Sequence, residues 1–440
     1  MRDFLVVVIV FGSVPFILVR PYIGILVWFW LSLMSPHRLT WGYAQELRVA
    51  LVDAAATILA WLLSREAKHP PNSPIIHLLG ALIIWVSIST AFAIHPDVAV
   101  DKWIEVMKIL GMTVIATCLI QSRERIQQLM WVIVASVGFY GVRGGIFTIL
   151  TRGDYHVFGP PGSFIEDNNQ LALALVMLVP LINAVRTSGT NRWIRLGLWG
   201  AMGLTVLAVF GSYSRGGLVA LCSMLAFLGL KSRQKLLTII IMAVVFGIGL
   251  SLVPDQWYKR MATIETYDAD SSLQGRFDAW NFSYRLALDR PLVGGGFDIW
   301  QDEALFSRYV PSAATNRAIH SIYFQLLSDN GFVGLGIYLA LLFVSFRTAG
   351  SIVRSTRDRP DLAWARSLAA MIQVSLVGYA VAGAFLSLGY FDLFYAIVAV
   401  LTVTQLVVRR ELAQSTAAAV ARPVSASREP QGLAPMAPHG

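Results

Sequence analysis

Apolar runs long enough to cross a lipid bilayer recur along almost the whole chain, and they constrain its fold more than any other feature. A helix rises about 1.5 Å per residue, so roughly 20 apolar residues cross the hydrocarbon core. Such runs lie at roughly 4–19, 21–34, 47–63, 75–93, 104–120, 126–150, 168–185, 194–211, 214–230, 235–253, 321–346, 363–385 and 389–407. Because the runs are continuous and do not alternate, they predict helices and not barrel strands. The sequence therefore predicts an all-α polytopic membrane protein with about 12–13 transmembrane helices.

The amino-acid composition agrees with a membrane protein. Of the 440 residues, 56% are hydrophobic and 14% are charged, and the mean hydropathy is +0.62. A soluble chain carries about 25% charged residues. The net charge of +9 does not indicate a nucleic-acid partner, because the basic residues are scattered in short loops and form no basic domain. We therefore expect the lipid bilayer as the surroundings of the chain and no nucleic acid as a partner.

The connections between the runs alternate in charge. Every second connection is basic: "SREAKHPP", "QSRERIQQ", "RTSGTNRWIR", "KSRQK" and "FRTAGSIVRSTRDRP". The positive-inside rule places these loops in the cytoplasm. The other connections then face outward: "AIHPDVAVDKW", "RGDYHVFGPPGSFIEDNNQ", "SYSRGG", the long segment 254–320 and "LSLGYFD".

This topology divides the chain into four parts. Residues 1–253 are N-terminal transmembrane helices, 254–320 an outward-facing segment, 321–410 C-terminal transmembrane helices, and 411–440 a disordered tail rich in Ala, Pro and Ser. The position of the amino terminus depends on residues 4–34. Two spans there give thirteen in all and an outer amino terminus, whereas one bent or partly re-entrant span places both ends inside. Because prolines interrupt this stretch, both arrangements are open, and we favour the even count.

Two arginines lie inside or between apolar runs, where a charge is expensive. Arg215 falls in "GSYSRGGLVAL", and the neighbouring Tyr213, Ser214 and glycines leave open backbone around it. The alternative to a functional role is that Arg215 is an interfacial arginine whose side chain extends to the lipid headgroups. Arg143 falls in "YGVRGGIF", where an interhelical contact is the structural alternative. Because Arg215 lies in an outward-facing turn, it shares a face of the membrane with the segment 254–320.

That segment contains a stretch with helical periodicity, "SSLQGRFDAWNFSYRLALDRP", which Pro291 ends. One face is apolar and consists of Leu273, Phe277, Trp280, Tyr284 and Leu288. Arg276 lies on an adjacent face. The helix either lies on the membrane surface or packs against the membrane helices, and the sequence leaves both open. The following "VGGGF" allows a tight turn or a close backbone approach to a ligand.

His320 lies near the start of the next helix. The positive end of a helix disfavours a protonated imidazole, so His320 is expected to stay neutral and to accept a proton. A structural histidine is the alternative. Asp167, Asn168 and Asn169 in the "FIEDNN" loop have helix capping as their simplest role, and Asn330 with the glycine after it predicts a break in the chain. The case for a site is that two arginines and one histidine converge on one outer face.

At these residues the chain resembles the bacterial O-antigen ligase and polymerase family. Three pieces carry the resemblance: "SYSRGGLVAL", "GRFDAWNFSYRLALDRPLVGGGF" and "HSIYFQLLSDNG", which together cover roughly 211–331. The chain departs from the family pattern at Ser321, where the family often has Asn, and at Asp329, where it often has Glu. The stretches "MRDF", "SPHRLTWG" and "YHVFGPPGSFIEDNNQLALAL" are similar to one branch, the O-glycosylation ligases found with exosortase systems.

The resemblance implies a GT-C-type membrane glycosyltransferase of the bacterial inner membrane, with its active site facing the periplasm. Such an enzyme takes a glycan from an undecaprenyl-pyrophosphate carrier and joins it to an acceptor, which in relatives is lipid A core, another glycan unit or a protein hydroxyl. We assign catalysis to His320 as the base and to Arg215 and Arg276, which suit a pyrophosphate leaving group. We assign substrate binding to the remaining candidates, namely Arg143, Tyr213, Ser214, Asp167, Asn168, Asn169, Ser321 and Arg290.

No cofactor is expected, because the pyrophosphate bond is already activated. The sequence shows no carboxylates at metal-ligand spacing, so we also expect metal independence. Two alternatives remain open. The first is an O-antigen or exopolysaccharide polymerase of the same family, which shares this chemistry. The second is a transporter of lipid-linked glycans, which would place its arginines along a pathway and would usually show paired broken spans.

Overall fold

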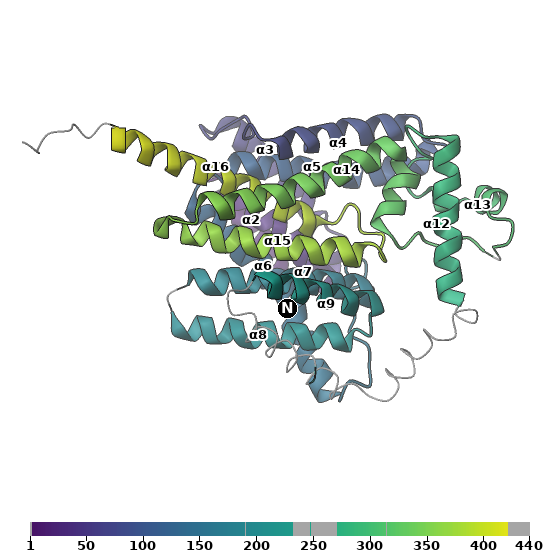
Figure 1. Ribbon diagram of the computed structural model, residues 1–440, viewed down its shortest axis with the longest axis horizontal. Helices are drawn as coiled ribbons and strands as arrows, with labels where there is room; N and C mark the ends of the chain where they lie inside the picture. Colours follow the sequence, from purple (N-terminus) through teal and green to yellow (C-terminus); the bar gives the residue numbers. More distant parts are fainter. Residues whose placement is uncertain (1, 190, 232–246, 248–270, 314, 421–440) are drawn as a thin grey trace, which may run out of the picture.

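The computed structural model describes residues 2–189, 191–231, 247, 271–313 and 315–420, and every regular element among them is a helix (Figure 1). The α-helices are α1 (Arg2–Val19), α2 (Tyr22–Met34), α3 (Val49–Leu63), α4 (Pro74–Ala91), α5 (Pro96–Leu119), α6 (Arg123–Leu150), α7 (Asn168–Ser188), α8 (Arg192–Gly211), α9 (Arg215–Lys231), α12 (Ser271–Asp289), α13 (Glu303–Tyr309), α14 (Ile322–Ser355), α15 (Ala363–Gly383) and α16 (Asp392–Val420). Short 3-10 turns are η1 (Pro36–Leu39), η2 (Tyr43–Gln45), η4 (Ile299–Gln301) and η5 (Pro360–Leu362).

Within the described residues, eight helices are long and apolar enough to cross a membrane: α1, α4, α6, α7, α8, α14, α15 with η5, and α16. Helices α2 and α3 are apolar but shorter. The architecture is therefore all-α and polytopic, as the apolar runs predict. The long helices lie side by side, and α12 stands across one end of them (Figure 1). The expected span 235–253 lies outside the described residues except for Gly247.

Residues 4–34 form two helices and not one bent helix. Helices α1 and α2 are separate and are joined by a tight turn at Arg20 and Pro21. The Asp3 carboxylate accepts hydrogen bonds from the Gly42 and Ala44 amides, at 3.1 and 3.2 Å, so the start of α1 lies beside the chain that follows α2. The two helices are therefore antiparallel. Pro21 suits the turn between them, because proline ends the first helix and is compatible with the first turn of the second.

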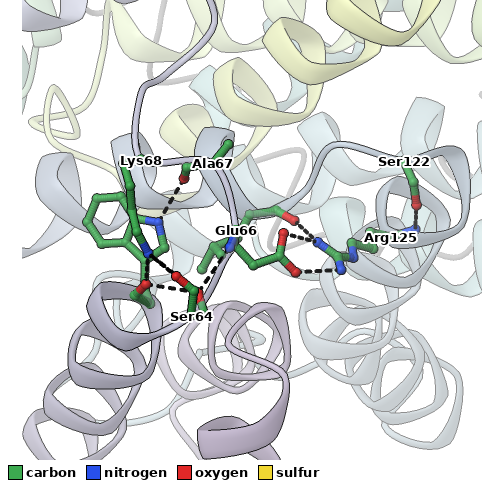
Figure 2. A network of polar contacts seen from close by, with 8 residues as sticks. Ser64, Glu66, Ala67, Lys68, Ser122 and Arg125 are labelled. Carbon is green, nitrogen blue, oxygen red and sulfur yellow. Dashed lines mark hydrogen bonds and ion pairs between the residues drawn. The ribbon is translucent and has the colours of Figure 1, made fainter.

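The basic loops meet at the end of the bundle away from α12, which we call the basic end and define by the segments 64–73, 120–122 and 356–362. Figure 2 shows two of these loops in contact: both terminal nitrogens of Arg125 donate to the Glu66 carboxylate, at 3.1 and 2.7 Å. Ser122 caps α6 and holds Arg125 at its first turn. These contacts place two of the loops that the charge pattern assigns to the cytoplasm at one end of the bundle.

Helix α16 begins at Asp392 and continues through Val420, so the disorder expected from residue 411 onward is wrong for 411–420. Residues 421–440 lie outside the described part of the chain. The helix continues because "ELAQSTAAAV" contains strong helix formers and no proline or glycine. Figure 1 shows this extension leaving the bundle at the basic end.

Helix α14 contains a break that organises the opposite end. Gly331 has φ 69° and ψ −172°, so the helical hydrogen bonds stop there, as the Asn-Gly pair predicts. The Ser328 and Asp329 carbonyls instead accept from the amides of Gly295 and Gly296, at 2.7 and 3.1 Å. The three glycines therefore permit close approach to another backbone, that of α14. The alternative expectation, approach to a ligand, is wrong for this contact.

Candidate functional site

The loops expected to face outward come together at the end of the bundle beside α12, which we call the site end and define by the segments 92–95, 151–167, 212–214, 290–321 and 384–391. The Asn168 side chain donates to the Ser212 carbonyl at 2.6 Å, and the Ile94 amide donates to Gly295 at 2.9 Å. The tyrosine hydroxyl of Tyr213 donates to the Gly153 carbonyl. Segments far apart in the sequence thus share one surface.

Arg215 is the first residue of α9 and lies at this end of the bundle. Tyr213 adopts a left-handed conformation with φ 58°, and its buried ring contacts the ring of His156 at 4.5 Å between centroids. The buried Ser214 hydroxyl accepts from the Gly217 amide at 3.0 Å and caps α9. Tyr213 and Ser214 therefore fix the turn that presents Arg215, which is half-buried.

The helices that begin at Arg215 and Ile322 both lie against the end of α15. A side chain added at Gly216 would meet Phe385 at 3.3 Å, and one at Gly383 would overlap Ile322, the first residue of α14. The starts of α9 and α14 therefore both contact the end of α15. Arg215 and His320, whose numbers differ by 105, therefore lie at or directly before the starts of two helices that share one neighbour.

His320 is exposed and has a left-handed backbone with φ 47° directly before the N-cap position of α14, which Ser321 occupies. The pKa of His320 is lowered, first because the surrounding protein displaces water from part of the imidazole and second because Arg276 is positively charged. Asp167 acts in the opposite direction and raises this pKa. The lowered pKa has the direction that a neutral imidazole requires, and its causes are desolvation first and Arg276 second.

Helix α12 positions Arg276 and the chain before His320. The indole of Trp280 donates to the Ile319 carbonyl at 2.9 Å and stacks on Phe324 at 5.1 Å between centroids. The residues that bury α12 are Ala279, Phe282 and Leu286, which pack on η4 and α13. Within the predicted apolar face, Phe277, Tyr284 and Leu288 stay exposed. Of the predicted apolar face, Trp280 packs on α14, so packing against the membrane helices covers part of that face only.

Three other predicted site residues have structural contacts. Asp167 and Gln170 form a capping box on α7. The backbone N–H of Asn169 donates to the Asp167 carboxylate at 2.8 Å. Arg290 donates to the carbonyls of Gly294 and Phe92, which joins α12 to α4. The structure thus makes Arg290 a connecting residue. Arg143 is exposed on α6.

A polar cavity of about 590 Å³ lies at the site end, and the sequence reasoning missed its residues. Seven positions of the lining carry an Asp, Glu, Lys or Arg side chain: Arg38, Lys102, Glu105, Lys108, Asp298, Asp329 and Asp392. Trp300 is part of the wall. A signal for three of these seven was present, because Lys102, Glu105 and Lys108 recur every third residue across the start of the apolar run 104–120 and so lie on one side of a helix. The ammonium of Lys102 lies 2.8 Å from Glu105.

Metal ligands require several histidine, cysteine or carboxylate side chains within reach of one ion. Among the described residues, no group of three or more such side chains is close enough to hold one. The positive groups at this end instead suit an anion. Guanidinium groups such as those of Arg215 and Arg276 are of the kind that bind phosphate oxygens, and a neutral imidazole such as that of His320 is able to accept a proton.

Comparison with known protein families gives two matches. Residues 200–339 match the O-antigen ligase family. This match contains Arg215, Arg276 and His320, and it supports a ligase- or polymerase-type function in O-antigen pathways and a membrane glycosyltransferase-like enzyme. Residues 1–190, which contain Arg143 and Asp167, match a family of unknown function (DUF5935). No curated protein matches the chain.

Proposed function

We propose that this protein transfers an oligo- or polysaccharide from undecaprenyl pyrophosphate to an acceptor hydroxyl, on a lipid or a protein, at the periplasmic face of the bacterial inner membrane. The observation that carries the proposal is the environment of His320, whose pKa is lowered by desolvation and by Arg276 inside the region that matches the O-antigen ligase family. A neutral imidazole next to a guanidinium combines a base with an anion-binding group.

The chemistry requires one proton transfer and one displacement. The neutral imidazole of His320 takes the proton of the acceptor hydroxyl, and the acceptor oxygen attacks the anomeric carbon. The bond between that carbon and the pyrophosphate oxygen breaks, and its electron pair stays on the pyrophosphate. Arg215 and Arg276 bind this anion and stabilise the charge that develops on it. A direct displacement of this kind inverts the anomeric centre.

Asp167 has a defined electrostatic part in this scheme. Its charge raises the pKa of His320, whereas Arg276 lowers it. Once the imidazole has accepted a proton, Asp167 stabilises the cation, and the departing anion near Arg276 removes part of the opposing positive charge. The two charged neighbours therefore allow His320 to begin neutral and to end protonated. Asn168 and Asn169 begin α7, and Ser321 is the N-cap residue of α14. Asn168 and Ser321 are buried, so their part in this scheme is to shape the site.

The test uses purified protein in nanodiscs with radiolabelled undecaprenyl-pyrophosphate glycan and three acceptors: lipid A core, a glycan and a protein. The variant His320→Gln should lower transfer about 10²–10⁴-fold while donor binding and thermal stability stay close to wild type. The matched control is His69→Gln, because His69 is an exposed histidine at the basic end. Equal turnover in His320→Gln and the wild type would refute the assignment of the base.

The products of the same assay separate the alternatives. One glycan joined to a lipid or protein indicates a ligase, and a ladder of lengthening glycans indicates a polymerase. Labelled donor that crosses the bilayer unchanged indicates a transporter. EDTA should leave transfer unchanged, since the scheme uses only side chains. Loss of transfer in EDTA that a divalent ion restores would replace this scheme with a metal-assisted one.

A further inference from the structure

A second positively charged site lies outside the region around His320. A groove of about 800 Å³ runs between the chain that follows α2, the last turns of α6 and the segment 156–162. Three arginines line it, Arg2, Arg38 and Arg143, together with His156. All four come from the part of the chain that matches the family of unknown function.

Arg143 lies in the middle of an exposed apolar face of α6. Phe139, Phe147 and Leu150 lie four residues before, four after and seven after it, and they are 40%, 40% and 78% exposed. This spacing puts them on one side of the helix. Arg143 is about 10 Å from the end of the helix by helical rise. An exposed arginine among lipid-facing side chains is expensive unless an anion accompanies it.

The groove arginines are available to a ligand. In the described part of the chain, the guanidinium groups of Arg2, Arg38 and Arg143 make no hydrogen bond or ion pair with the protein. The nearby carboxylates have other partners: Asp3 accepts from the Gly42 and Ala44 amides, and Glu166 accepts from the Gly162 amide at 2.7 Å. The positive charge of the groove is thus left without a pairing carboxylate.

The groove connects to the site already described. His156 lines the groove and contacts the ring of Tyr213, two residues before Arg215. Arg38 and Gly162 line both the groove and the polar cavity of about 590 Å³. One side chain, that of His156, therefore separates a ligand in the groove from the turn that presents Arg215. The groove also opens onto the polar cavity, which is large enough for sugar residues.

We propose that this groove docks the pyrophosphate of the polyprenyl carrier as it enters from the bilayer, with the polyprenyl chain on the exposed face of α6. Arginine suits this headgroup because its planar fork binds phosphate oxygens in pairs. The exposed aromatic side chains of Trp41 and Phe158 at the groove suit the boundary between water and lipid. The identity of the carrier rests on the proposed function, whereas the docking of a lipid pyrophosphate rests on the groove alone.

The first experiment measures binding without turnover. Radiolabelled undecaprenyl pyrophosphate is titrated against protein in nanodiscs of phosphatidylcholine, and a photoreactive analogue maps where its chain lies. Arg38→Gln and Arg143→Gln should each weaken binding about tenfold, since each removes a charge-assisted contact. Arg143→Lys should recover part of the loss. The control Arg308→Gln removes an exposed arginine from α13 and should change nothing.

Three outcomes would overturn the proposal: unchanged binding in both groove variants, crosslinks that avoid the end of α6, or equal competition by phosphatidylglycerol or inorganic pyrophosphate. The last result would mean a general anion site with no preference for this lipid.

The second experiment separates this inference from the proposed function. In the transfer assay, Arg143→Gln should raise KM for the lipid donor about tenfold and leave kcat within about twofold, because docking precedes the chemical step. A raised KM for the acceptor alone would assign the groove to the acceptor and refute the proposal. If wild-type protein binds the lipid through these arginines but transfers nothing, the proposed function fails and the docking groove stands.

Discussion

Replacement of Gly331 by alanine should break the contact between α14 and the segment 291–296. The glycine has φ 69° and ψ −172°, a conformation that only glycine adopts without strain, and forcing another residue into it costs about 1–3 kcal/mol. A Cβ there would also overlap the carbonyls of Leu292 and Pro291. The Phe332 amide donates to that Pro291 carbonyl at 2.8 Å, and losing this hydrogen bond costs about 1 kcal/mol more.

The overlap of the added Cβ with these carbonyls also pushes the Gly295 and Gly296 amides away from the α14 carbonyls that they donate to. Each buried group left without its hydrogen bond costs about 1–3 kcal/mol of stability. The sum is about 4 kcal/mol or more, which corresponds to roughly 10³-fold faster local opening. Hydrogen–deuterium exchange in detergent should show this acceleration in the peptide that covers 291–296, while peptides from the basic end stay protected.

The matched control is Gly336→Ala in the same helix, where nothing lies within 4 Å of an added Cβ. Alanine at that helical position should keep or increase stability by up to about 1 kcal/mol. The argument fails if Gly331→Ala exchanges as slowly as Gly336→Ala. It also fails if both variants open the segment equally, because the cost would then not come from the backbone conformation.

Three further predictions concern the site and the topology. Transfer should fall as the pH decreases through the pKa of His320. Because that pKa is lowered, the plateau of the pH–rate profile should extend below the ordinary pKa of histidine. A profile independent of pH would contradict a histidine base. Arg215→Lys should lower kcat nearly as much as Arg215→Ala, about 100-fold, since lysine keeps the charge but loses the planar fork; wild-type rates in either variant would leave Arg215 as an interfacial residue. In a background without the two native cysteines, Ser312→Cys should react with an impermeant reagent from the periplasm and Ser355→Cys should not, and the reverse result would invert the topology.

The fold class was determined by local properties of the sequence. Each apolar run contains its own helical hydrogen bonds, and a bilayer acts on every run in the same way, so length and composition alone identify the helices. The break at Gly331 and the helix over Ser271–Asp289 were readable for the same reason, because glycine freedom and amphipathic spacing act within a few residues. The sequence analysis missed that α16 continues past Glu411. The prediction of disorder there relied on the content of Ala, Pro and Ser over the whole tail and not on the helix propensity of its first ten residues.

The contacts between segments needed the tertiary structure. The sequence could show that α12 has an apolar face, but the face that packs, with Ala279, Phe282 and Leu286, depends on where η4 and α13 lie. It could show glycines before Phe297, but not that their partner is the backbone of α14.

The same limit applies to the charged residues of the site. Arg38 belongs to a loop that the sequence relates to nothing else, and only folding places it beside Arg143 and the polar cavity. Helix formation and membrane crossing depend on residues that are neighbours along the chain. A site depends on the distances between side chains that are up to hundreds of positions apart in the sequence. The sequence therefore predicted that arginines and a histidine face one side of the membrane. Which of them act together is decided by packing, because only packing brings their charges within a few ångströms, where they change one another's pKa and bind one anion.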